Sequence, residues 1–114
     1  MRIEVKGRNV VVGDELRERI EKRCEKVARQ VSPLAVMDVE LSEERNPSIK
    51  DAHIAEITLR LKGVTLRSRC AATSMTHAVN ESIDDLARQV KRHRDKRRAR
   101  RAARDVEVRP AASP

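Results

Sequence analysis

The sequence predicts an α+β two-layer sandwich with the element order β-α-β-β-β-α, in which two helices cover one face of a four-stranded sheet. Four short segments alternate apolar and polar residues, which is typical of half-buried strands. Two longer segments carry apolar residues three or four positions apart, which is typical of amphipathic helices. The 114 residues suffice for one domain. Because Phe, Tyr and Trp are absent, the core must be built from aliphatic side chains.

A first strand and a first helix are predicted within residues 2–31. Ile3 and Val5 alternate with charged residues, and the chain turns at residues 7–9. Gly13 is a candidate N-cap, and the two acids that follow it suit the positive end of a helix dipole. Ser32-Pro33 is expected to end this helix. Its predicted apolar stripe consists of Leu16, Ile20, Cys24, Val27 and Val31.

Three more strands are predicted, and the last two form a hairpin. Residues 37–42, 55–62 and 64–70 alternate in polarity, and residues 43–51 between the first two of these segments read as a loop. Gly63 is placed where a tight hairpin turn is needed. The predicted inward-facing residues are Met37, Val39, Leu41, Ala55, Ile57, Leu59, Leu61, Val64, Leu66, Ser68 and Cys70.

The second predicted helix begins after the cap Thr73-Ser74 and is the longer one. Its apolar stripe ends at Val90, but helix-favouring residues continue to Arg104. The stripe consists of Met75, Val79, Ile83, Leu86 and Val90. We therefore expect a domain over residues 1–104. Residues 105–114, which contain two prolines, are expected to form a flexible tail or the start of a linker.

The net charge of +8 is concentrated in one segment. Residues 1–87 contain 15 Lys and Arg against 15 Asp and Glu, whereas residues 88–104 contain 10 Lys and Arg and a single acid, Asp95. Such a patch attracts a polyanion, which is a nucleic acid, an anionic lipid surface or an acidic protein. A plain solvated helix end is the alternative without a binding role.

The composition of this segment favours nucleic acid. It carries nine Lys or Arg among residues 91–104 and no large apolar side chain, so it lacks a face that inserts into a membrane. Like charges three and four residues apart repel, and a phosphate backbone would relieve that repulsion and release counterions. The candidate RNA-binding residues here are Arg88, Lys91, Arg92, Arg94, Lys96, Arg97, Arg98, Arg100 and Arg101.

Two other regions offer further cations. The first helix carries five cations interleaved with glutamates, so either a salt-bridged surface or a second RNA face fits the pattern. These cations are Arg19, Lys22, Arg23, Lys26 and Arg29. The open sheet face carries Arg60, Lys62, Arg67 and Arg69. Because aromatic residues are absent, this face cannot be a base-stacking platform. Readout of RNA shape and backbone is favoured over readout of sequence.

Catalytic, metal and cofactor chemistry is not indicated. The three histidines and two cysteines have no metal-ligand spacing, and the three glycines form no phosphate-binding loop. Cys24 and Cys70 are expected to be reduced core residues. Asp84 and Asp85 are predicted to lie on different helix faces, with Glu81, Asp84 and Arg88 in surface pairs. We expect no enzyme, cofactor, metal or small-molecule substrate.

No transmembrane or signal segment is evident either. The sequence has no run of about 18 apolar residues, and its first residues alternate polar and apolar side chains instead of forming an apolar stretch. A cytoplasmic location without membrane association is expected by default.

Several motifs resemble the ribosome hibernation promoting factors, also called ribosome-associated inhibitors. These are Gly7-Arg8 after the first strand, VGDELR at residues 12–17, Leu59-Arg60-Leu61 with Gly63, and Met75 opening the second helix. The most specific match is IDDLARQVKRHRDK at residues 83–96, where an apolar stripe runs into a Lys- and Arg-rich end. The resemblance covers about residues 1–96.

The resemblance implies a β-α-β-β-β-α fold and binding to 16S-type rRNA of the small ribosomal subunit, in the channel for messenger and transfer RNA. Translation would be blocked and idle ribosomes preserved under stress. The contacting positions that it implies are Arg88, Lys91, Arg92, Arg94 and Lys96, together with Lys22, Arg23 and Lys26. Thr76 stands where the family commonly has Tyr, and Gly13 stands where the family often has a Thr cap.

Long members of this family carry a second, dimerising domain after a linker. The chain is therefore expected to be either a short form or a truncated long form. A lone domain is expected to inactivate single ribosomes, and pairing two ribosomes would need a partner factor or the missing domain. A constitutive ribosomal or ribosome-assembly RNA-binding protein is the competing interpretation.

Overall fold

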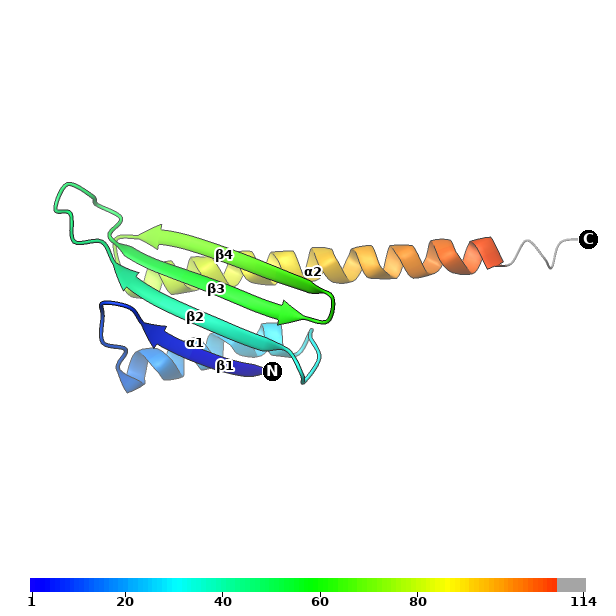
Figure 1. The fold of residues 1–114 in the computed structure, drawn as a ribbon, viewed down its shortest axis with the longest axis horizontal. Coiled ribbons are helices and arrows are strands. Elements are labelled where there is room, and N and C mark those ends of the chain that lie inside the picture. Colours follow the sequence, from blue (N-terminus) through cyan, green and yellow to red (C-terminus); the bar gives the residue numbers. More distant parts are fainter. Residues whose placement is uncertain (109–114) are drawn as a thin grey trace, which may run out of the picture.

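The predicted α+β sandwich is confirmed in the computed structural model, which describes the backbone of residues 1–108 and the side chains of residues 1–103. The elements are β1 (Arg2–Gly7), α1 (Asp14–Ala28), β2 (Val36–Glu43), β3 (His53–Leu61), β4 (Val64–Ala72) and α2 (Met75–Val108). Both helices lie on the same side of the sheet, and α2 continues far past the sheet's end (Figure 1).

The sheet has the strand order β1-β2-β3-β4, with β1 parallel to β2 and the other pairs antiparallel. Its register aligns inward side chains in rows across the strands. One row joins Val5, Val39, Ile57 and Ser68. The first three of these residues are buried in the core together with the apolar stripes of both helices. The predicted inward faces of the second and third strands are therefore confirmed.

The parallel β1–β2 pair requires a crossover, which α1 supplies. Ile20, Cys24 and Val27 are fully buried, as the spacing predicts. The helix ends at Ala28, earlier than the predicted stop after residue 31. The N–H groups of Arg29 and Gln30 bond back to Glu25 and Val27, which closes the last turn of the helix before Pro33 is reached.

The hairpin between β3 and β4 has the predicted two-residue turn, Lys62-Gly63. Leu61 pairs directly with Val64 across it. Gly63 has a φ of +79°, in the left-handed region that glycine adopts without steric strain. The short turn matters for the site because it places Lys62 at the end of the sheet beside α2.

The long helix α2 starts where the sequence predicts. The Ser74 hydroxyl accepts a hydrogen bond from the His77 N–H at 3.2 Å, which satisfies one of the unpaired donors of the first turn. Val79, Ile83, Leu86 and Val90 are buried. The helix reaches Val108, four residues past the Arg104 to which helix-favouring composition continues. Residues 109–114 lie outside the described residues.

The two cysteines are free and differ in environment. Cys24 is buried and its Sγ lies 3.4 Å from the Met37 Sδ. Burial raises the pKa of the Cys24 thiol to about 12, so the thiolate needed for nucleophilic or metal chemistry is disfavoured. Cys70 is only half-buried, because its strand lies at the edge of the sheet.

Candidate RNA interface

The basic half of α2 projects beyond the core. Val90 is the last buried residue of the helix, and the 18 residues from there to Val108 extend about 27 Å at the rise of an α-helix. Figure 1 shows this half running free of the sheet. The side chains of Lys91, Arg92, Lys96, Arg97, Arg98, Arg100 and Arg101 are exposed, and that of Arg94 is half-buried.

These cations are available to a ligand. Within the described part of the chain, no salt bridge involves any Lys or Arg from Lys91 to Arg101. Arg88 differs, because its guanidinium lies 3.7 Å from Asp85 one turn earlier. The segment is therefore a cationic rod whose one acid, Asp95, forms no salt bridge among the described residues, and it projects from a domain whose own charges balance.

A groove of about 760 Å³ between α1 and α2 gathers part of the predicted site. Arg23 and Lys26 from α1 face Arg88, Lys91 and Arg94 from α2 across it. Arg29, which the sequence also placed among the cations of this region, lines the groove as well. Lys22 is exposed but is not among the residues that line this groove, so α1 contributes two of the three predicted positions.

Asp84 ties the two walls of this groove together. Lys26 Nζ donates to one carboxylate oxygen at 2.7 Å, and Arg23 Nη2 donates to the other at 3.2 Å. The hydrogen bond from Lys26 is the main cause that lowers the pKa of Asp84, and Arg23 adds to it against the opposing effect of burial. Asp84 thus positions Arg23 and Lys26, and it would compete with a phosphate for the hydrogen bonds that these two side chains donate.

The predicted pairing of Asp84 along its own helix is wrong. Asp84 pairs across to α1, while Glu81 pairs with His77 at 2.8 Å and Arg88 with Asp85. The prediction that Asp84 and Asp85 point to different faces is confirmed, because Asp85 accepts a hydrogen bond from the Ser68 hydroxyl of β4 at 2.8 Å. Sequence spacing alone favours partners one turn away and cannot show a neighbouring helix.

A second concave region lies at the end of the sheet, where the α1–β2 connection and the β3–β4 turn meet α2. It encloses about 670 Å³ and combines apolar residues with cations. His93, Arg94, Arg97, Arg98 and Arg101 line it from α2. Their spacing continues the apolar stripe that ends at Val90, so this face of α2 could have been recognised in the sequence, whereas the contribution of Lys62 could not.

The open sheet face is less cationic than its sequence indicates. Arg60 Nη1 lies 2.6 Å from an Asp38 carboxylate oxygen, and Arg69 Nε lies 2.9 Å from one of Glu56. Both partners stand on neighbouring strands, where directly opposed or adjacent side chains meet. Two of the four arginine and lysine side chains considered for that face are therefore compensated.

Within the described residues, no group of three His, Cys, Asp or Glu side chains is placed to hold a metal ion. None of the described helices combines the length and the apolar character that crossing a membrane requires.

The model of the family described as "Sigma 54 modulation protein / S30EA ribosomal protein" matches residues 3–98. The chain belongs to this family. The S30EA match covers the sheet, both helices and the basic half of α2 as far as Arg98. It confirms the resemblance drawn from the sequence motifs, since curated relatives carry the name ribosome hibernation promoting factor.

Relatives of this S30EA chain are similar over most of its length. The Salmonella typhimurium ribosome hibernation promoting factor is 30% identical over 96 residues, which cover 84% of this chain and 96% of that protein. The Acinetobacter guillouiae factor is 28% identical, with 82% and 88% covered. The Picosynechococcus factor is 27% identical, and the chain spans 50% of its length.

Solved structures show the same fold. The N-terminal domain of Thermus thermophilus Protein Y superposes with a TM-score of 0.69 at 28% identity, covering 82% of this chain and 99% of that domain. A ribosomal subunit interface protein from Coxiella burnetii gives a TM-score of 0.67 at 19% identity, covering 83% and 99%. The S30EA chain therefore has the fold of these two structures.

Proposed function

We propose that this protein binds 16S-type rRNA of the small ribosomal subunit, in the channel that messenger and transfer RNA otherwise occupy, and so inhibits translation while preserving idle ribosomes. The observation that carries the proposal is the cationic rod of α2, whose charges from Lys91 to Arg101 have no acidic partner within the described residues. A rod of this kind fits between phosphate backbones, which supply the missing counter-charge.

The interhelical groove extends the same surface. Arg23, Lys26, Arg88, Lys91 and Arg94 line one continuous concave face, so an RNA strand lying along α2 would also meet α1. The neutral sheet domain packs against the first half of α2 and so fixes the direction in which the rod extends. A protein that blocks the channel by occupying it needs no catalytic group. It needs a shape that fits the RNA channel and a positive charge that complements the phosphates.

The proposal is tested by reversing charge where α2 leaves the core. We expect Lys91→Glu/Arg92→Glu/Arg94→Glu to lose most cosedimentation with vacant small subunits and most inhibition of cell-free translation. Each residue lies at or beyond the last buried position of the helix, so the fold is retained. Thermal melting of the variant, within a few degrees of the unmodified protein, checks that point.

A matched control carries the same change in net charge at the opposite end of the sheet. Lys6, Arg45 and Lys50 are exposed and lie on or near the β2–β3 loop end of the molecule, away from the free end of α2 (Figure 1). Lys6→Glu/Arg45→Glu/Lys50→Glu should keep most binding and inhibition. If both triple variants lose binding equally, net charge and not the α2 rod is responsible, and the proposal fails.

A constitutive ribosomal or assembly protein would use the same RNA-binding rod. The two functions differ in occupancy. Quantifying the protein on ribosomes from growing and from starved cells distinguishes them, because a hibernation factor accumulates on idle ribosomes and a structural component stays near one copy per subunit throughout.

A further inference from the structure

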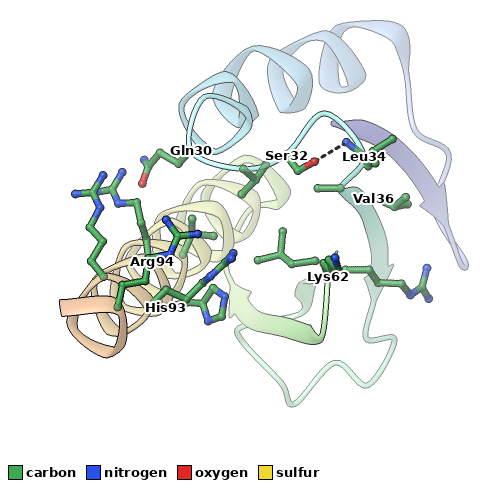
Figure 2. Close-up of a pocket in the computed structure, with 15 residues that line it drawn as sticks. Gln30, Ser32, Leu34, Val36, Lys62, His93 and Arg94 are labelled. Carbon is green, nitrogen blue, oxygen red and sulfur yellow. Dashed lines mark hydrogen bonds between the residues drawn. The ribbon is translucent and has the colours of Figure 1, made fainter. Parts of the chain in front are cut away.

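The cavity at the end of the sheet is built by three segments that are distant in the sequence. Figure 2 shows Ser32 and Leu34 on the α1–β2 connection, Lys62 in the β3–β4 turn, and His93 and Arg94 on α2, placed around one hollow. A volume of about 670 Å³ is within the range of cavities that hold small organic groups. The family match does not assign any ligand to it.

One wall of this cavity is apolar, and its rim is open to solvent. Val31, Leu61 and Val90 form its inner part, and Leu34 stands at the rim with 90% of its surface exposed. The loop that carries Leu34 is held in shape by Ser32, whose hydroxyl accepts a hydrogen bond from the Leu34 N–H at 3.1 Å. The Ser32 carbonyl also accepts one from the Ala35 N–H at 3.0 Å. An apolar side chain is thus presented to solvent by an ordered turn.

The facing wall is cationic. Arg94, Arg97, Arg98 and Arg101 follow Val90 on the same side of α2 and all line the cavity. Within the described residues, none of the side chains that line it is acidic. The Arg94 Nε is shielded from solvent and has no hydrogen-bond partner among the described residues, and Arg94 lines both this cavity and the interhelical groove. Such a donor gains a partner when an anion binds, and an unpaired buried donor is otherwise unfavourable.

We propose that this cavity takes one unstacked nucleotide of an RNA, with the base against the apolar wall and the adjoining phosphates on the α2 arginines. The inference rests on the proposed function, since the cavity opens beside the rod along which the rRNA backbone would lie. An unstacked base combines a flat apolar face with two flanking phosphates. Guanidinium groups stack on such faces and pair with such phosphates.

The occupant must be unstacked, because a base inside a duplex exposes only its edge. The lack of aromatic residues excludes an aromatic stacking platform and leaves aliphatic contact and arginine stacking as the means of holding a base. The cavity would therefore recognise an RNA structure, a bulged or looped-out nucleotide, rather than a sequence. The carboxylates of an acidic peptide would pair with the arginines, but such a peptide has no flat ring to pack against Leu34 at the rim.

The test uses three RNA hairpins that differ at one position. The first carries a single bulged 2-aminopurine nucleotide, the second an abasic bulge with the same phosphates, and the third no bulge. We expect the full chain to bind the first at least about fivefold more tightly than the second, which corresponds to the lower end of the range for stacking of a base on an aromatic side chain. The 2-aminopurine fluorescence should change on binding.

Leu34 supplies a variant that leaves the core intact. Leu34→Ser should bring the preference for the bulged base over the abasic bulge close to one, and Leu34→Met should keep it. Val11 is 97% exposed and does not line the cavity, so Val11→Ser is the matched control and should keep the full preference. The same four proteins are pelleted with small subunits in parallel.

The outcomes separate this inference from the proposed function. Equal affinity of the unmodified protein for the bulged and abasic hairpins overturns the nucleotide site, and normal pelleting with small subunits would then leave the proposed function standing. Failure to pellet with small subunits overturns the proposed function itself. If Leu34→Ser weakens pelleting without changing hairpin affinity, the cavity contacts a protein and the nucleotide assignment is wrong.

Discussion

Asp84 is a single carboxylate placed among the cations of the interhelical groove. Its hydrogen bonds with Arg23 and Lys26 hold the ends of two flexible side chains in fixed positions and join α1 to α2. Both pairs are partly exposed, so their contribution to stability is modest. Their larger effect concerns binding, because a phosphate that enters the groove must compete with the carboxylate for the same two donors.

We expect Asp84→Asn to tighten RNA binding a few-fold while lowering the free energy of unfolding by less than about 1 kcal/mol. Affinity for a short RNA and urea unfolding measure the two effects. Asp51→Asn makes the same charge change at an exposed loop position and should alter neither by as much. Weaker binding by Asp84→Asn would show that positioning of Arg23 and Lys26 outweighs competition.

The Asp84 interaction also has a pH dependence. Its pKa is lowered in the folded protein, so the stabilisation is present above the ordinary Asp pKa of about 3.9 and is lost as the pH falls through the lowered value. The difference in urea midpoint between the unmodified protein and Asp84→Asn should therefore be constant near pH 7 and shrink below about pH 4. A difference that persists undiminished to pH 2 contradicts this assignment.

At the scale of elements, α2 has two halves with different reasons to be helical. The first half is held by burial of Val79, Ile83, Leu86 and Val90. The second half has no buried apolar residue among those described, and its closely spaced cations repel one another. Its helical geometry therefore depends on continuity with the first half. A substitution that breaks the helix in this half and keeps its charge tests whether binding depends on the helical shape or on the charge alone.

Ala99 offers a position for that experiment because it is exposed and lies two to three turns past the last core contact. Ala99→Pro removes one helical hydrogen bond and disfavours the helix locally by about 3 kcal/mol. We expect lower helicity by circular dichroism, an unchanged urea midpoint, and weaker binding to small subunits. Ala99→Gln, which leaves the helix and charge intact, is the control. Equal binding by the two variants would show that the basic segment acts only through its charge.

At the scale of the whole molecule, a neutral sheet domain carries a cationic helix that extends past it (Figure 1). Residues 1–87 carry equal numbers of acidic and basic residues. Several of these residues form ion pairs with one another, including Asp38 with Arg60 and Glu56 with Arg69. Attraction to a polyanion is therefore directed to the free half of α2, to the interhelical groove and to the cavity at the end of the sheet. Such binding should depend on salt with a slope that counts phosphate contacts.

We expect the logarithm of the affinity for small subunits to fall linearly with the logarithm of salt concentration. Lys91→Gln/Arg92→Gln/Arg94→Gln should make that slope shallower by about 2 to 3, since each phosphate contact contributes about 0.7 to 0.9. Lys6→Gln/Arg45→Gln/Lys50→Gln should leave the slope nearly unchanged. Parallel lines for all three proteins would mean that residues 91, 92 and 94 do not contact phosphate.

The order and type of the elements were predictable from the sequence because they depend on local patterns. Alternation fixed the faces of β2 and β3, the spacing of Val79 to Val90 fixed the buried side of α2, and Gly63 marked the hairpin. The end of α1 was misplaced, since helix-favouring composition changes gradually where the chain gives no sharp stop.

The sequence by itself determined the fold class, the family and the concentration of positive charge past Val90, because periodicity and charge are properties of neighbouring residues. Only the tertiary structure showed that Arg23 and Lys26 pair with Asp84, 61 and 58 residues away. Only it placed Leu34 and Lys62 beside the arginines of α2. Contacts of this kind arise from the packing of α1, the hairpin and α2 around one core, which no local pattern encodes.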